Sequence, residues 1–151
     1  MNSQVLFHLA FPVTDIDRTK AFYVSGLGCE LGRESPSSLI LNLCGHQIVA
    51  HVTHEPLTPQ RGIYPRHFGL VFTSESDWEA LLEMAQQKQL NFYQESRRRF
   101  PGLPTEHRTF FLEDPFGNLL EFKYYCDPEA IFGRSEYAQV GDYVLGIRDC
   151  Y

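Results

Sequence analysis

Long apolar runs are missing from this 151-residue sequence, and no segment approaches the roughly 18 consecutive apolar residues that a membrane-spanning helix needs. The apolar start, from Val5 to Val13, is interrupted by His8 and Pro12. No basic segment precedes it, and no small-residue cleavage site follows it, as a secretory signal would require. We therefore expect no membrane span and no export signal, and we predict a cytoplasmic protein.

A basic excess is also absent, since 13 Lys and Arg face 19 Asp and Glu, which gives a net charge of −6. No broad positive field is therefore available to attract nucleic acid or an anionic membrane, and we expect neither as a partner. Hydrophobic residues make up 43% of the chain and charged residues 21%, as in ordinary globular proteins. The length fits one compact domain or two closely joined halves.

Cysteine is sparse and never paired in a Cys-x-x-Cys motif. This excludes the spacing of a zinc knuckle or a redox dithiol, and we expect reduced thiols. The four cysteines are Cys29, Cys44, Cys126 and Cys150.

The sequence contains an internal repeat. Residues 8–15 (HLAFPVTD) and 67–74 (HFGLVFTS) each begin with His, an apolar residue, a small residue and another apolar residue. Each ends in Thr followed by Asp or Ser, and the two starts lie 59 residues apart (67 − 8). Such self-similarity indicates two copies of one structural unit.

A helix is predicted after each copy of this strand-like segment. In the first copy Asp15 or Asp17 can cap a helical turn, which the glycines that follow would end. In the second copy Ser74 or Ser76 can cap a helix over residues 77 to about 89, where apolar residues recur at helical spacing.

Strand-like runs then follow each helix, at 38–44 and 47–52 in the first copy and at 109–112 and 119–125 in the second. The last two flank the turn 114–118 (DPFGN), in which proline presets one backbone angle and Gly or Asn accepts a positive one. The sequence therefore predicts an α+β fold whose order is strand, helix and strands, twice over.

The proposed domain organisation follows from this repeat. We expect a single domain over residues 1–126, made of two modules at about 5–55 and 65–125. The segment 53–65, which holds several prolines and a glycine, would be the linker between them. Residues 127–151 would form a C-terminal extension, for which a cap, a lid and a dimer arm remain open.

Side-chain alternation places three groups of metal-ligand type on comparable strand faces. His8, His67 and Glu121 each lie opposite the apolar face that would pack against a helix. Two imidazoles and a carboxylate form the ligand set of non-haem iron(II) oxygenases, and manganese accepts it as well. The alternative is that all three face water on the exposed side of an antiparallel sheet.

The order His8, His67, Glu121, together with the segment 114–121 (DPFGNLLE), resembles the vicinal oxygen chelate superfamily. This superfamily includes glyoxalase I, extradiol dioxygenases, fosfomycin-resistance transferases and metal-free bleomycin-resistance proteins. The resemblance covers residues 5 to about 125. It implies two βαβββ modules that form a half-open barrel around a metal held by these three residues. The modules of such proteins pair within one chain or across a dimer, and we expect a homodimer.

The branch of the superfamily depends on the number of ligands. Glyoxalase I proteins use a fourth ligand from the end of the first module, but the matching residue here, Val49, cannot bind metal. Three ligands favour the extradiol dioxygenases or the fosfomycin-resistance enzymes. The metal-free branch lacks these ligands.

Other side chains are candidates for supporting roles. His51 can handle protons near neutral pH, and Tyr125 can donate a hydrogen bond to a bound oxyanion, because it falls on the Glu121 face. The arginines at 97–99, with Arg108, could clamp an anionic substrate. A solvated loop is the interpretation we favour for this charge run.

The resulting hypothesis is a metalloenzyme that holds Fe(II) or Mn(II), with Ni(II) or Zn(II) also accepted by this ligand set. Its substrate would be a small molecule with two vicinal oxygens, such as a catechol, cleaved by an extradiol-type dioxygenase reaction. One alternative keeps the metal for a glyoxalase-like isomerase or lyase reaction or a thiol transfer. Another is a metal-free drug- or metabolite-binding protein.

Overall fold

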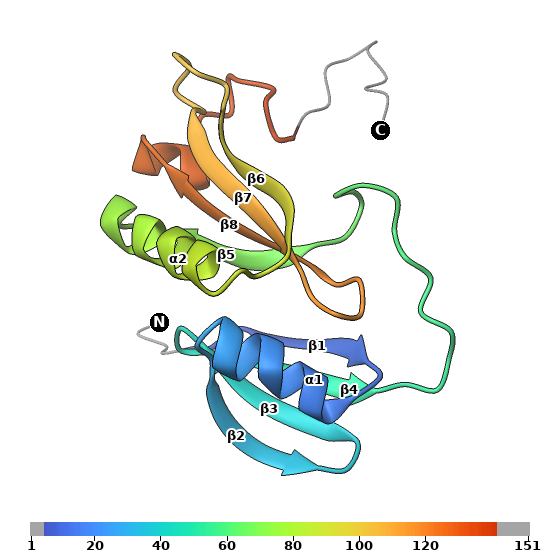
Figure 1. The fold of residues 1–151 in the computed structure, drawn as a ribbon. Helices are drawn as coiled ribbons and strands as arrows, with labels where there is room; N and C mark the ends of the chain where they lie inside the picture. The colour runs from blue at the N-terminus through green and yellow to red at the C-terminus, as the bar shows by residue number, and fades with distance from the viewer. Residues whose placement is uncertain (1–4, 142–151) are drawn as a thin grey trace.

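The computed structural model describes residues 5–141 and contains two four-stranded sheets, with strand orders β1-β4-β3-β2 and β5-β8-β7-β6 (Figure 1). The strands are β1 (His8–Val13), β2 (Glu30–Ser35), β3 (Ser38–Leu43), β4 (His46–Val52), β5 (Phe68–Phe72), β6 (Phe92–Arg99), β7 (His107–Glu113) and β8 (Leu119–Tyr125). The helices are α1 (Ile16–Lys20), which continues as the π-helix η1 (Ala21–Gly26), α2 (Glu75–Gln87) and the 3-10 helix η2 (Pro128–Ile131).

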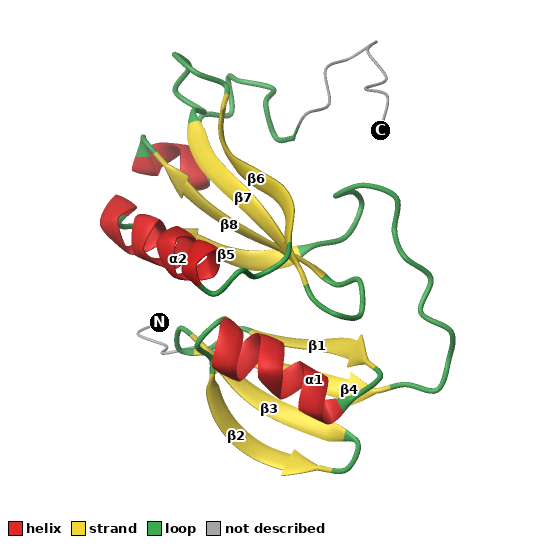
Figure 2. Cartoon of the chain, in the orientation of Figure 1, coloured by secondary structure: helices red, strands yellow, loops and turns green. Residues whose placement is uncertain are grey.

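The two sheets repeat one topology, which confirms the predicted α+β fold of two βαβββ modules. In each module the first strand pairs in parallel with the last, β1 with β4 and β5 with β8, and the other neighbours are antiparallel. One helical segment follows the first strand of each module (Figure 2). The chain between Val52 and Phe68, which joins the modules, has no helix or strand.

The helix starts follow the expected capping chemistry. The Asp15 carboxylate accepts a hydrogen bond from the Arg18 backbone N–H (2.7 Å), and the Ser74 hydroxyl accepts one from the Asp77 N–H (3.3 Å). Each side chain satisfies an amide that has no partner within its helix. Of the two caps considered for each helix, Asp15 and Ser74 are used, so α2 begins at Glu75, two residues before the predicted start.

The prediction of a solvated loop for the arginine-rich segment is wrong. Residues 97–99 do not form a solvated loop but the end of strand β6, which pairs with β7. The pattern was misleading because β6 is an edge strand with polar residues on both faces, and its register with β7 shifts twice. Such bulges interrupt the period-two pattern from which strands are recognised.

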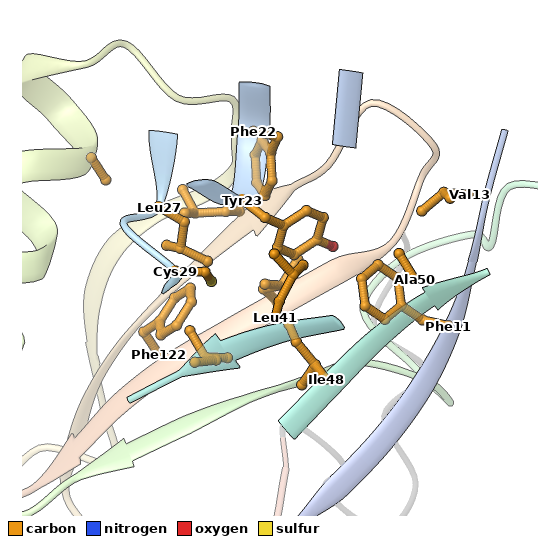
Figure 3. Close-up of a cluster of buried hydrophobic side chains, with 14 of the residues drawn as sticks. Phe11, Val13, Phe22, Tyr23, Leu27, Cys29, Leu41, Ile48, Ala50 and Phe122 are labelled. Atoms are coloured by element: carbon orange, nitrogen blue, oxygen red, sulfur yellow. The ribbon is translucent and has the colours of Figure 1, made fainter. Parts of the chain in front are cut away.

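A large hydrophobic core joins the two modules (Figure 3). It lies between the helix-facing sides of the sheets, where the rings of Phe11 and Phe68 approach to 5.4 Å. Tyr23 and Trp78 are its largest buried side chains, each with no exposed surface. The core contains residues of both repeats: Phe11, Val13, Phe22, Tyr23, Leu27, Leu39, Leu41, Ile48, Trp78, Phe110, Leu112, Leu120 and Phe122, among others.

Polar contacts also connect the modules. The buried Tyr23 hydroxyl donates to Asp114 Oδ2 (2.8 Å), and Asn118 Nδ2 donates to the Pro12 carbonyl (2.9 Å). Lys88 Nζ donates to the Ser25 carbonyl (2.8 Å). The DPFGN turn, predicted as a hairpin connection, therefore also attaches the second module to the first.

Because the helix-facing sides meet in the core, the opposite sides of the two sheets point away from it. We call them the first and second site faces, since they carry the predicted ligands. On the first site face His8, Ala10 and Pro12 are exposed. On the second, β5 contributes Gly69 and Val71, both exposed.

The C-terminal extension is described as far as Gly141. This residue lies beside the linker, where a Cβ on Gly141 would be 2.6 Å from the Tyr64 hydroxyl. The rest of the predicted extension, 142–151, lies outside the described residues. Over residues 5–141, none of the helices has the length and apolar character needed to cross a membrane.

Candidate metal centre

Two of the predicted ligands meet on the second site face. His67 Nε2 lies 3.0 Å from Glu121 Oε2. The close approach of β5 to β8 brings them together, because Gly69 stands opposite Glu121 and a Cβ there would lie 1.7 Å from the Glu121 carbonyl oxygen. Glycine is therefore required beside this pair.

Glu121 is a buried, charged carboxylate with 6% of its surface exposed. Its Oε1 accepts a hydrogen bond from the Thr109 hydroxyl (2.8 Å), and Lys123 Nζ lies 3.6 Å from Oε2. Burial alone would raise its pKa, but the hydrogen bond from His67, the charge of Lys123 and the Thr109 hydroxyl together hold the pKa at about 2. The carboxylate is thus kept ionised, as a metal ligand must be.

The tautomer of His67 is set by its backbone contact. Its Nδ1 donates to the Ile63 carbonyl (2.7 Å), so in the neutral ring Nε2 carries a lone pair directed at Glu121. A hydrogen bond between Nε2 and the carboxylate therefore needs the protonated ring, and this bond raises the pKa of His67 above 6.5. A cation between the two groups would replace that proton.

This pair predicts a pH dependence for the metal-free protein. The pKa of His67 is raised above 6.5, so its contribution to stability is complete below pH 6.5 and is lost as the pH rises through the folded-state pKa. The pKa of Glu121 is lowered from 4.5 to about 2, so its contribution is complete above pH 4.5 and is lost as the pH falls towards 2. The stabilisation from the pair should therefore be greatest between pH 4.5 and 6.5.

Urea unfolding at several pH values, in the presence of a chelator, would test this. The difference in unfolding free energy between the wild type and Glu121→Gln should be largest inside that window and smaller on either side. A difference that stays the same below pH 4.5, within the window and above pH 6.5 would contradict the arrangement.

His8, the third predicted ligand, lies on the first site face and not beside the other two. Over residues 5–141, no three His, Cys, Asp or Glu side chains are grouped closely enough to hold a metal ion. His8 is exposed, and its Nδ1 donates to Gln47 Oε1 (2.8 Å) on the neighbouring strand β4. The single chain therefore presents one predicted ligand on one face and two on the other.

The donor set nevertheless fits a divalent metal. Both histidines donate from Nδ1 to an oxygen, His8 to Gln47 and His67 to Ile63, which leaves Nε2 as the potential ligand atom on each ring. Histidines that bind metals usually make such a second hydrogen bond, because it fixes the ring and its tautomer. With the ionised Glu121, they provide two nitrogens and a carboxylate oxygen.

The remaining predicted residues occupy separate places. His51 is exposed on β4, where its Nδ1 lies 3.2 Å from the Ser38 hydroxyl. Val49 lies on the same face and is 8% exposed. Tyr125 is on the second site face, opposite His107, with the two ring centroids 4.8 Å apart.

Sequence reasoning missed the groups that support the ligands. Gln47 and Thr109 could have been found by strand alternation, since they share faces with His8 and Glu121 respectively. Alternation also puts Lys123 on the Glu121 face, but its ion pair depends on side-chain conformation. The Ile63 carbonyl has no sequence signal, because any residue provides one.

The fold and these faces define a paired-βαβββ protein that carries ligand-type residues on the sheet faces directed away from its core. The sequence matches the Glyoxalase/Bleomycin resistance protein/Dioxygenase superfamily over residues 5–122, so the chain belongs to this superfamily. Comparison with curated proteins gives no match.

Solved structures agree with this assignment. A glyoxalase/bleomycin resistance protein/dioxygenase from Alicyclobacillus acidocaldarius is 42% identical, with a TM-score of 0.82 over 87% of this chain and 100% of that one. A fosfomycin resistance protein from Listeria monocytogenes (19% identity, TM-score 0.64, 85% and 98% covered) shares the fold. So does a lactoylglutathione lyase from Agrobacterium tumefaciens (15% identity, TM-score 0.63, 88% and 99% covered).

Proposed function

We propose that this protein is a metal-dependent enzyme for small molecules with two vicinal oxygens, and that its reaction is an extradiol-type ring cleavage. The observation that carries the proposal is the pairing of His67 with the buried carboxylate of Glu121, with the His67 Nδ1 held by a backbone carbonyl. Fe(II) or Mn(II) would supply Lewis acidity towards the two oxygens and redox chemistry towards dioxygen. Val49, which cannot bind metal, leaves the ligand set at three and leaves positions open.

The protein's own groups would then orient the ligands and the substrate. Thr109 fixes one carboxylate oxygen of Glu121, so that the other is directed towards His67. Phe111, fully buried with its ring 5.1 Å from that of His67, keeps the imidazole in place and excludes water from one side. His51 would accept or return a proton of the substrate, and Tyr125 would donate a hydrogen bond to an anionic oxygen.

We further propose that the site forms between two chains, with His8 of one chain and the His67–Glu121 pair of another. Two observations support this arrangement: the ligands lie on different faces, and apolar side chains are exposed next to them. Phe7 precedes His8 and is 57% exposed, Leu6 is 65% exposed, and Val71 on β5 is 40% exposed. Exposed apolar surface of this kind often marks a protein interface.

The first test is the metal content per chain after anaerobic purification. We expect close to one equivalent in the wild type and almost none in His8→Ala, His67→Ala and Glu121→Ala, since losing a ligand should weaken binding more than the roughly 10- to 100-fold lost with a supporting group. Asn42→Ala, altered at an exposed position on β3, is a suitable control and should keep its metal. A wild type without metal, even after Fe(II) or Mn(II) is added, would refute the proposal.

Oxygen consumption with catechols tests the reaction itself. Uptake that depends on the metal and on Glu121 would support ring cleavage. A metal-loaded protein that consumes no oxygen with any catechol would instead favour an isomerase, a lyase or a thiol transferase, as would turnover of a hemithioacetal.

A further inference from the structure

Part of the linker, residues 60–66, forms a loop that one side chain closes. Gln60 Nε2 donates to the backbone carbonyls of Gly62 (3.0 Å) and Arg66 (2.7 Å). Gln60 Oε1 accepts from the Arg66 backbone N–H (3.1 Å) and from the Arg66 Nε (3.4 Å). The donors and the acceptor of the amide are thus all used, and they join the two ends of a segment that has no helix or strand.

Ile63, in the middle of this loop, anchors it to the second module. Its side chain is 6% exposed and packs with Phe111 of β7 and Leu119 of β8, in a buried cluster distinct from the core between the modules. Phe111 stands directly opposite Glu121, and Leu119 precedes Glu121 by two residues, so both lie on the second site face. The loop is therefore held against the part of the sheet that carries the candidate ligand Glu121.

The backbone carbonyl of Ile63 decides which nitrogen of His67 carries the hydrogen. This carbonyl accepts from Nδ1 (2.7 Å), while Nε2 lies 3.0 Å from Glu121 Oε2. A neutral imidazole has a single N–H, so the carbonyl and the carboxylate compete for it. The carboxylate alone would draw the hydrogen to Nε2, the atom that a metal would need. The carbonyl draws it to Nδ1 and leaves the Nε2 lone pair available.

This competition depends on where the loop holds the carbonyl. A hydrogen bond weakens steeply when its length and angle depart from the ideal, and the direction of a carbonyl follows its backbone. The bonds of Gln60 reach both sides of Ile63, at Gly62 and at Arg66. Without them, only the packing of the Ile63 side chain would orient the carbonyl towards His67.

We propose that Gln60 is a positioning residue for the metal centre. By closing the loop 60–66, it keeps the Ile63 carbonyl on His67 Nδ1 and so keeps His67 Nε2 available to a metal. This rests on the proposed function and adds a segment of the linker to the site. Gln60 acts through Ile63 and His67, and not by touching the metal or the substrate.

The first test measures the tautomer of His67 without any metal. The full-length chain is labelled with ¹⁵N, treated with a chelator and studied at a pH at which the ring is neutral, with long-range ¹H–¹⁵N NMR spectra that show which ring nitrogen carries the hydrogen. We expect Nδ1–H in the wild type. Gln60→Met keeps the length of the side chain but loses these four hydrogen bonds, and it should shift the ring towards Nε2–H. Gln86→Met, at an exposed position on α2, is the matched control and should leave the tautomer unchanged.

The second test measures the affinity for Mn(II) by titration of the same chains. Gln60→Met should bind Mn(II) about tenfold more weakly than the wild type, as when a group that supports a ligand is lost. Gln86→Met should stay within about twofold, as for an ordinary surface substitution. Gln60→Glu keeps an acceptor for the Arg66 N–H groups but loses both donors, so it should lie between the wild type and Gln60→Met in both tests.

An unchanged tautomer in Gln60→Met, or a Mn(II) affinity equal to that of Gln86→Met, would overturn the proposal. Its failure is distinguishable from failure of the proposed function, because the tautomer is measured without metal. A wild type that binds no metal, while Gln60→Met shifts the tautomer, would refute the metalloenzyme and confirm the hold of Gln60 on His67. A wild type that binds metal no more tightly than Gln60→Met would refute only the positioning role.

Discussion

Hybrid dimers made from His8→Ala and Glu121→Ala chains should bind metal although neither variant does so alone. If the site combines His8 of one chain with His67 and Glu121 of another, a hybrid contains one site with both defects and one with none. Hybrids isolated through two different affinity tags should therefore hold about half the metal of the wild-type dimer, and half its activity. Each parent should hold almost none.

This experiment separates a metal site formed within one chain from a site formed between two chains. His8 and the His67–Glu121 pair lie on different site faces of one chain, and Asp114, Tyr23 and the common core hold the modules in that arrangement. Bringing the faces together within one chain would require the core to separate, which would expose side chains such as Tyr23 and Trp78.

Two outcomes would contradict the cross-chain site. Hybrids that bind no metal, although the wild type does, would mean that the three ligands come from the same chain. Tagged chains that never co-purify would mean that no dimer forms. A hybrid of His67→Ala with Glu121→Ala is the matched control: both defects lie on the same module, so no intact site forms in either arrangement.

The largest effect on stability is expected at Asp114. Its Oδ1 accepts hydrogen bonds from the backbone N–H groups of Phe116 and Asn118, and its Oδ2 accepts from the Tyr23 hydroxyl. Asp114→Ala would leave the buried Tyr23 hydroxyl and two half-buried backbone N–H groups without this acceptor in the junction between modules. We expect the free energy of unfolding to fall by about 3 kcal/mol or more, since each unsatisfied buried group costs about 1–3 kcal/mol.

Urea unfolding followed by the fluorescence of Trp78, the single tryptophan, measures this change. Tyr23→Phe removes one of the donors and should cost about 1–2 kcal/mol. Asp17→Ala, an exposed aspartate on α1, should cost less than about 0.5 kcal/mol. An Asp114→Ala protein that is no less stable than Asp17→Ala would show that the turn does not hold the modules together.

Much of this architecture could be predicted because it is encoded locally. Capping by Asp15 and Ser74 depends only on residues within one helical turn. Strand β8 begins and ends where the sequence pattern predicted, at residues 119 and 125. Alternation also placed Tyr125 on the face of Glu121. These features depend on neighbours in sequence, which is where sequence patterns carry information.

What could not be predicted depends on contacts distant in sequence. The arginines of β6 form a strand because β7 pairs with them, and their composition alone favours a loop. The repeat showed that His8 and His67 are equivalent, but the direction in which the two sheets face is decided by the core, through contacts such as Phe11 with Phe68. The sequence pattern therefore could not predict how far His8 lies from the His67–Glu121 pair.

The shared core also bears on how such a chain could have arisen. One module taken alone would expose the side chains that the other module now covers, Phe11 and Tyr23 in the first and Phe68 in the second. An ancestral polypeptide of half this length would therefore have needed a second copy of itself to cover its core, with the same surface used on both sides. Duplication and fusion would have turned that self-association into an intramolecular contact. The two copies could then diverge, one keeping a single predicted ligand and the other acquiring a pair.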